Sequence, residues 1–278
     1  MRDIAFQKWE ATGNDFFFVD AEAENLTLED FSYDLVQSLC QRGPQNKRGA
    51  DGLVLFRLAS ADQPATMDIL NSDGSLAGMC GNALRCLAKI LAQQTGIPKQ
   101  KVQLSEREVS VCAIDPENPK VYMGQPSSLK DRKLLEEEVS LSQCLGLKNS
   151  YLLSFGNPHL VAPVQSLPED WVALGGKVQA PAHELFKTRG INCGFLVTTP
   201  DAEGFYRLCV FERGAGVTQA CGSGACAASI ILETVLSVET PHKFKLPGGV
   251  LTIDRQENDI TLSGPANFEY EETWSLPL

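Results

Sequence analysis

The chain carries the same short motif twice, 141 residues apart, and this duplication constrains its fold more than any other feature. The first copy is Met79-Cys80-Gly81-Asn82 and the second is Ala220-Cys221-Gly222-Ser223. Each copy precedes an apolar run that predicts a helix, so each cysteine is expected at a helix start. Unpaired backbone N–H groups and the positive end of the helix dipole favour a thiolate there, and they can also hold a substrate carboxylate.

Other landmarks recur at the same or nearly the same offset. Arg189-Gly190-Ile191-Asn192 matches Arg48-Gly49-Ala50-Asp51, and Glu212-Arg213-Gly214 matches Asn71-Ser72-Asp73. Gly156-Asn157-Pro158-His159 similarly matches the Gly13-Asn14-Asp15 turn. We interpret the chain as two homologous α/β halves, each with one central helix headed by a cysteine.

The elements between these landmarks favour a curved, mostly antiparallel sheet in each half, because short strands alternate with many Gly/Pro turns. In the first half the sequence predicts a strand, a turn and a strand from Ile4 to Asp20. A single helix is expected from Leu28 to Cys40, with Thr27 and Asp30 as its capping box. Val102 to Ala113 is expected to be strand. The connection between halves is placed in residues 124–145, which include the charged run Lys130 to Glu138.

The composition and net charge of the chain limit the kinds of partner that it could bind. The chain has 278 residues, a formal charge of −11 and a pI near 4.8, which argues against a nucleic-acid or anionic-membrane partner. It begins without the apolar segment of a signal peptide and has no apolar run of membrane-spanning length, so we expect a cytoplasmic protein. None of its nine cysteines forms a C-x-x-C pair, which favours neither a disulfide framework nor a zinc site. A homodimer is the candidate assembly.

Two helix-start thiols that face a shared cleft suit the inversion of a stereocentre. One thiolate would remove an α-proton from one face of the carbon, and the opposing thiol would return a proton to the other face. Backbone N–H groups at the two helix starts would stabilise the charge that develops on the adjacent carboxylate. This chemistry needs no metal and no cofactor, and we expect neither.

The ordered set of motifs resembles the diaminopimelate epimerase family, from Gly13-Asn14-Asp15-Phe16 to Gly264. This family consists of cofactor-independent isomerases that interconvert LL- and meso-diaminopimelate in bacterial lysine and cell-wall synthesis. The resemblance implies an α/β (α+β) fold of two pseudo-symmetric domains, each a sheet rolled around a central helix. It places residues 1–124 plus 265–278 in the N-terminal half and residues 125–264 in the C-terminal half.

The resemblance also assigns roles by position. Cys80 and Cys221 would be the catalytic acid and base, and His159 would lie beside the site without a definite role. Donors to the carboxylate at the reacting centre would be Gly81, Asn82, Gly222 and Ser223. The rest of the substrate would be bound by Asn14, Asn71, Asn157, Asn192, Glu212 and Arg213, with Arg213 on the distal carboxylate.

The chain departs from the family pattern in four places, and these leave its exact substrate open. Ala83 replaces a glycine, Ser105 to Glu108 replaces a Thr/Gly turn, Phe155 replaces a usual methionine, and Gln179-Ala180 lies where an acidic residue and a histidine are usual.

Two alternative functions follow. One is a racemase of the same fold that acts on proline, hydroxyproline or histidine, although proline-type enzymes carry His where this chain has Asn82. The other is a thiol redox-sensing or ligand-binding protein in which the two thiols form a regulatory disulfide. Taken singly, Asn14 and Asn157 could also be simple turn formers, and Cys86 and Cys226 are expected to be structural.

Overall fold

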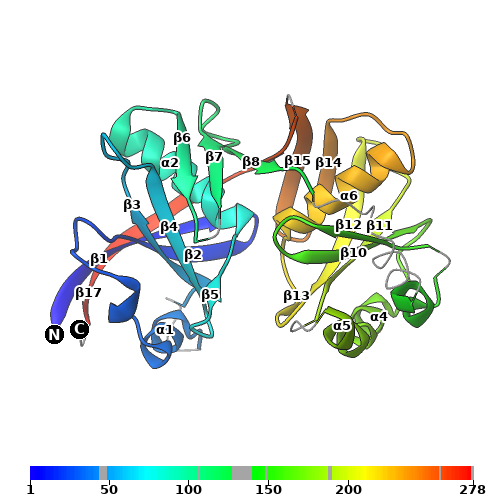
Figure 1. Ribbon diagram of the computed structural model, residues 1–278, viewed down its shortest axis with the longest axis horizontal. Helices are drawn as coiled ribbons and strands as arrows, with labels where there is room; N and C mark the ends of the chain where they lie inside the picture. Colours follow the sequence, from blue (N-terminus) through cyan, green and yellow to red (C-terminus); the bar gives the residue numbers. More distant parts are fainter. Residues whose placement is uncertain are drawn as a thin grey trace. The chain divides into compact units, whose positions relative to one another are not determined.

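The protein divides into two compact units. Unit 1 comprises residues 1–122 and 263–278, and unit 2 comprises residues 123–262 (Figure 1). The computed structural model describes residues 1–43, 49–105, 107–126, 140–147, 149–186, 190–256 and 258–276. The predicted linker Lys130 to Glu138 and the arginines Arg48 and Arg189 lie outside these residues. No helix within the described ranges is long and apolar enough to span a bilayer.

The sheet of unit 1 is mostly antiparallel. Among the described residues β2–β3 and β4–β6 pair in parallel, whereas β1 pairs antiparallel with both β2 and β17, β3 with β4, β4 with β5, β6 with β7 and β7 with β8. The strands are β1 (Arg2–Ala11), β2 (Asn14–Asp20), β3 (Gly52–Arg57), β4 (Ala65–Asn71), β5 (Leu76–Ala77), β6 (Lys99–Gln103), β7 (Glu108–Cys112), β8 (Lys120–Gly124) and β17 (Asn267–Leu276).

Unit 2 repeats this order of pairings. β10 pairs parallel with β11, β11 antiparallel with β12, β12 antiparallel with β13 and parallel with β14, and β14 antiparallel with β15. The same succession links β2 through β7 in unit 1, so the duplication in the sequence is a duplication of topology. The strands are β9 (Tyr151–Ser154), β10 (Pro158–Val164), β11 (Asn192–Val197), β12 (Phe205–Glu212), β13 (Gly216–Val217), β14 (His242–Leu246), β15 (Gly249–Gln256) and β16 (Asp259–Ser263).

Each unit wraps its strands around one central helix. In unit 1, α2 (Gly81–Thr95) contacts β1, β2, β6 and β7, and it ends at Gly96, whose φ of 72° suits glycine. In unit 2, α6 (Gly222–Thr234) contacts β9 to β12 and β15. The predicted α/β architecture, a mostly antiparallel sheet rolled around a central helix in each half, is confirmed.

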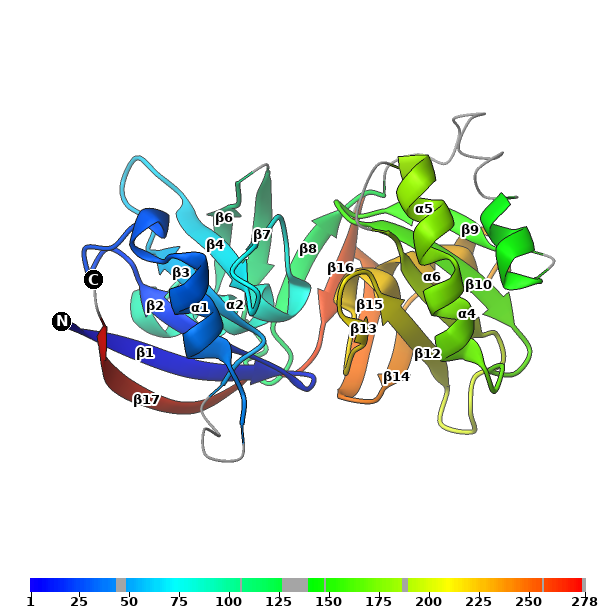
Figure 2. The same cartoon turned by 90° about the horizontal axis from the view of Figure 1, so that it is seen from below.

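Further helices cover the outer face of each sheet. Phe16 to Val19 of β2 are all buried, although successive side chains of a strand point to opposite faces. Phe17 and Val19 pack against α1 (Tyr33–Cys40), so the opposite face of β2 is the one that faces α2. In unit 2 the outer layer is α4 (Trp171–Lys177) and α5 (Gln179–Phe186), drawn in Figure 2.

Two elements that were predicted to be continuous are each divided in the structure, so both predictions are wrong in this respect. The single helix from Leu28 to Cys40 is a short 3₁₀ turn, Leu28–Asp30, followed by α1, because Phe31 leaves the helix in an extended conformation to enter the core. The Thr27–Asp30 capping box exists but belongs to the 3₁₀ turn, and Ser32 caps α1 instead. The strand from Val102 to Ala113 is two strands, β6 and β7. They are separated by a turn in which the Leu104 N–H donates to the Arg107 carbonyl at 2.8 Å.

Candidate active site

Cys80 is the N-cap residue of α2 and the starting point of the half-site in unit 1. Its backbone is extended, with φ −140° and ψ 112°, and its carbonyl accepts the first helical bond from the Leu84 N–H at 3.0 Å. Backbone N–H groups in the first turn of a helix have no acceptor within the helix. The thiol is partly exposed, whereas Gly81 and Asn82 behind it are buried. A partly exposed sulfur at a helix N-terminus is well placed to ionise.

Cys221 caps α6 in the same way, with φ −116° and ψ 101°, but its surroundings differ. Its side chain is only 5% exposed. Burial, together with the negative charge of Glu212, raises the pKa of the thiol well above its usual value, and bonds from the Gly224 N–H and the Ser223 hydroxyl offset only part of this effect. The Ser223 Oγ lies 3.7 Å from the sulfur. Cys221 therefore holds its proton in the structure as it stands.

His159 belongs to the same cluster in unit 2. Its Nε2 lies 3.0 Å from the Ser223 Oγ, and the register of β10 and β11 places it beside Asn192. The ring is 1% exposed, and burial together with the charge of Arg213 lowers the pKa of the imidazole to about 3. His159 is consequently neutral at physiological pH.

The neutrality of His159 makes unit 2 sensitive to acid. The pKa in the fold lies below the usual 6.5, so the unfolded chain binds a proton that the fold excludes, and stability falls as pH drops from about 6.5 towards 3. At pH 5 the expected loss from this residue is about 2 kcal/mol. Urea unfolding of the wild type and His159→Gln at pH 7 and pH 5 measures it, because glutamine can keep the bond to Ser223 without titrating. An equal pH dependence in both proteins would contradict the assignment.

The substrate-binding candidates of unit 2 form one connected set. The Arg213 Nη2 donates to the Asn157 Oδ1 at 2.9 Å, and the Arg213 N–H donates to the Asn192 Oδ1 at 3.0 Å. Glu212, which ends β12, accepts a hydrogen bond from the Thr218 hydroxyl in addition to facing Cys221. The structure thus brings these residues together around the start of α6.

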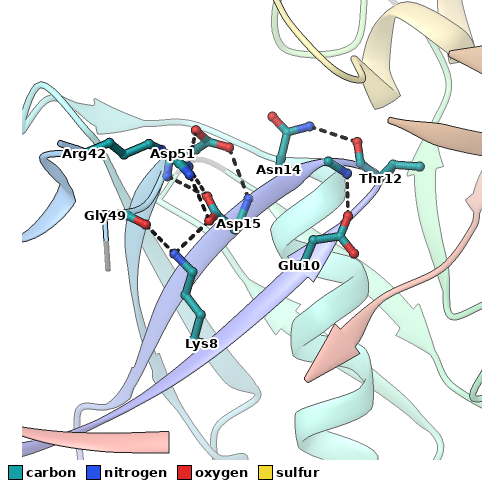
Figure 3. A network of polar contacts seen from close by, with 9 residues as sticks. Lys8, Glu10, Thr12, Asn14, Asp15, Arg42, Gly49 and Asp51 are labelled. Carbon is teal, nitrogen blue, oxygen red and sulfur yellow. Dashed lines mark hydrogen bonds and ion pairs between the residues drawn. The ribbon is translucent and has the colours of Figure 1, made fainter. Parts of the chain in front are cut away.

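In unit 1 an ion-pair network fixes the turn that carries Asn14 (Figure 3). The buried Lys8 Nζ lies 2.8 Å from the Asp15 carboxylate and 2.6 Å from the Gly49 carbonyl, while Arg42 bridges Asp15 and Asp51. Burial would raise the pKa of Asp15, but the bonds and charges of Lys8 and Arg42 hold it below its usual value. The pKa of Asp51 is instead raised, by burial and by the charge of Asp15.

Asn71 is the last residue of β4 and begins the turn that follows the strand. Its Nδ2 donates to the Ser75 Oγ at 3.0 Å, and its carbonyl accepts from the Gly74 N–H at 2.8 Å. Gly74 has φ 82°, and a Cβ there would lie 2.8 Å from the Tyr33 Cα, so the turn requires glycine. The Asp51 carbonyl accepts from the Ser72 N–H at 3.1 Å, which ties this turn to the network around Asp15.

Residue-by-residue reading of the sequence missed three contacts. Arg85 of α2 is fully buried and donates a hydrogen bond to Asn82. The sequence feature that could have indicated this contact is a cation within an apolar helical run. Arg107, in the segment that departs from the family, donates to the Met79 Sδ next to Cys80. Gln179, at another departure, accepts from the Ile191 N–H at 3.0 Å and donates to the Ile191 carbonyl at 3.0 Å, which holds the segment that leads into Asn192.

A family model described as diaminopimelate epimerase matches residues 6–129 and 151–269. Among curated relatives, a diaminopimelate epimerase of Bacillus subtilis (strain 168) is 32% identical over 301 residues, covering 99% of this chain and 100% of the relative. One of Carboxydothermus hydrogenoformans is 34% identical, covering 98% and 100%. One of Acidiphilium cryptum (strain JF-5) is 34% identical, covering 96% and 94%.

Solved structures share the fold at much lower identity. A phenazine biosynthesis protein of the PhzF family from Bacillus anthracis is 14% identical, with a TM-score of 0.66 and coverage of 99% of this chain and 100% of that one. A hydroxyproline epimerase from Agrobacterium vitis is 15% identical, with a TM-score of 0.65 and coverage of 99% and 91%. At these identities the likeness concerns the fold alone.

Proposed function

Because the chain belongs to the diaminopimelate epimerase family, we propose that it interconverts LL- and meso-diaminopimelate by moving the proton on one α-carbon, without a cofactor. The observation that carries this proposal is the pair of cysteines, each the N-cap of the central helix of its unit. The product would feed lysine and peptidoglycan precursor synthesis.

The two thiols would divide the proton transfer between them. Cys80, partly exposed at its helix start, would act as the thiolate that removes the α-proton. Cys221, whose proton is retained by burial and by Glu212, would deliver that proton to the opposite face of the carbon. After one turnover Cys80 carries a proton and Cys221 is a thiolate, so the reverse reaction starts from that state. The mechanism requires both sulfurs to reach one α-carbon during turnover.

The remaining polar groups would hold the substrate in place. The N–H groups of Gly81 and Gly222, with Asn82 and Ser223, would bind the carboxylate at the reacting centre, where charge accumulates in the transition state. Arg213 would bind the distal carboxylate through two parallel N–H bonds. Asn14, Asn71, Asn157 and Asn192 would bind the distal amine and the remaining oxygens.

The test is a substrate panel in D₂O. We expect the wild type to convert LL-diaminopimelate to the meso form and to incorporate one deuterium at the inverted α-carbon, as read by NMR and mass spectrometry. Proline, hydroxyproline and histidine should show neither inversion nor exchange. Turnover of one of these amino acids but not of diaminopimelate would overturn the substrate assignment and keep the reaction type.

A cytoplasmic location and a homodimer are part of the same proposal. Light scattering coupled to size exclusion tests the assembly, since a dimer doubles the 30.2 kDa mass of the chain.

A further inference from the structure

Arg85 is a cation buried in the interior of unit 1. It lies in the second turn of α2, is 0% exposed, and has Leu84, Cys86 and Leu87 around it in the sequence, all buried. A charged side chain is buried at this depth only when other groups hold it, because its desolvation is costly. The groups that hold Arg85 therefore indicate what it does.

The guanidinium of Arg85 points back towards the N-terminus of its own helix. Its Nη1 donates to the Asn82 Oδ1 at 3.1 Å, and its Nη2 donates to the Thr12 hydroxyl. Long helical side chains lean towards the preceding turn, which brings the charge of residue 85 to the first turn behind Cys80. The bond to Asn82 orients a residue that, under the proposed function, binds the reacting carboxylate.

The second bond reaches the turn that carries Asn14. Thr12 is 1% exposed and has φ 52°, a conformation that is unfavourable for a β-branched residue. Figure 3 shows Asn14 beside Thr12, where the Asn14 Nδ2 lies 3.5 Å from the Thr12 carbonyl. One guanidinium thus links the start of α2 to the β1–β2 turn, and with it two candidate substrate-binding residues.

Unit 2 has no cation at the equivalent position. The repeat offset of 141 places Cys226 opposite Arg85 and Ser223 opposite Asn82. There Ser223 is bonded to His159, which is neutral, and the cysteine at the helix start faces the carboxylate of Glu212. The two half-sites therefore differ in electrostatics although they share a backbone. A positive charge lies behind Cys80, and a negative charge lies beside Cys221.

Other charged groups lie on the elements around Cys80. Glu10 of β1 accepts from the Gly13 N–H and, through its Oε2, from the Asn267 Nδ2 at 3.1 Å. Lys89, one turn further along α2, donates to the Ala266 carbonyl at 2.7 Å. Arg107, from the β6–β7 turn, contacts Met79. Among these groups Arg85 is the cation bonded to a residue of the first helical turn.

We propose that Arg85 is a positioning residue for the Cys80 half-site: it fixes Asn82 and the Asn14 turn, and its charge makes Cys80 the thiolate of the pair. This inference rests on the proposed function for its catalytic meaning. Its electrostatic content concerns the thiol alone, and can be measured without turnover.

The experiment is alkylation of Cys80 by iodoacetamide across pH 6 to 10, followed by peptide mass spectrometry on the full chain. In the wild type the midpoint should lie below the usual thiol value of about 8.5. In Arg85→Met it should rise by about one unit, so that alkylation at pH 7 becomes about tenfold slower. Arg85→Lys keeps the charge but loses the fork, so its midpoint should stay near wild type while KM for diaminopimelate rises.

Lys89→Met is the matched control, because it removes one charge from the same helix at a residue bonded elsewhere. Its Cys80 midpoint should stay within a few tenths of a unit of wild type. A folded Arg85→Met protein with the wild-type midpoint overturns the inference. If that variant does not fold, Arg85→Gln replaces it, and a wild-type midpoint at or above about 8.5 overturns the inference without any variant.

Epimerisation measured on the same samples separates the two proposals. A wild type that leaves diaminopimelate unchanged while Arg85→Met shifts the Cys80 midpoint defeats the proposed function and keeps the electrostatic role of Arg85. If the wild type epimerises diaminopimelate but Arg85→Met leaves the Cys80 midpoint unchanged, the proposed function is kept and the electrostatic role of Arg85 is defeated.

Discussion

Replacing either Cys80 or Cys221 by alanine is expected to lower epimerisation of diaminopimelate by about 10²- to 10⁴-fold, since each variant removes one positioned acid or base and the reaction requires both. Alanine removes the sulfur and leaves the helix N-terminus intact. The loss should therefore appear in kcat, while KM changes little. The measurement is the conversion of LL- to meso-diaminopimelate by each single variant.

The two variants should also differ from each other in deuterium exchange. A protein that keeps only one thiol can remove and return a proton on one face of the carbon, so it exchanges one stereoisomer at most and inverts neither. If Cys80 is the thiolate in the resting state, Cys221→Ala should retain more exchange than Cys80→Ala. Equal exchange in both would contradict the assignment of the resting thiolate to Cys80.

Cys86 and Cys226 provide the matched controls. Each lies on the same helix as one of the proposed catalytic thiols and is 0% exposed, and burial raises the pKa of Cys86 far above its usual value. Cys86→Ala and Cys226→Ala should cost about 1 kcal/mol of stability and leave kcat within about twofold of wild type. A Cys80→Ala variant with more than a tenth of wild-type activity would sink the two-thiol mechanism.

The sequence predicted the architecture well where the signal was local and repeated. The apolar runs after Cys80 and Cys221 made both central helices visible, and Cys80 and Cys221 are their N-caps. Gly13 and Gly74 belong to turns that the sequence indicated, and in the structure both have positive φ values, which glycine tolerates. Such features depend on a few neighbouring residues, so they can be read without knowledge of tertiary contacts.

The features that sequence reasoning missed depend on tertiary contacts. Phe31 interrupts the expected Leu28–Cys40 helix because its ring packs into the core of unit 1. The helical spacing of apolar residues does not reveal this tertiary contact. The asymmetry of the two thiols arises because Cys221 is buried and faces Glu212 at the end of β12, and burial and proximity of this kind come from tertiary packing. The role of Arg85 was missed for the same reason. Its hydroxyl partner, Thr12, lies 73 residues away in the chain, so the contact depends on tertiary structure.

Arg213→Met is expected to raise KM for diaminopimelate by about 10²-fold, because a hydrogen bond to a charged group contributes about 1.5–3 kcal/mol and the distal carboxylate would lose its cation as well. The fold should tolerate the change. The backbone N–H of residue 213 keeps its bond to the Asn192 Oδ1, and only the side-chain bond to Asn157 is lost. Initial rates over a range of substrate concentrations separate KM from kcat.

Two comparisons make the Arg213 prediction specific. Arg213→Lys keeps the charge but loses the fork that matches a carboxylate, so its KM should lie between those of the wild type and Arg213→Met. The charge of Arg213 also helps to lower the pKa of His159, so Arg213→Met should lose less stability between pH 7 and pH 5 than the wild type. A KM unchanged in Arg213→Met, together with this altered acid stability, would show that Arg213 acts on His159 and not on the substrate.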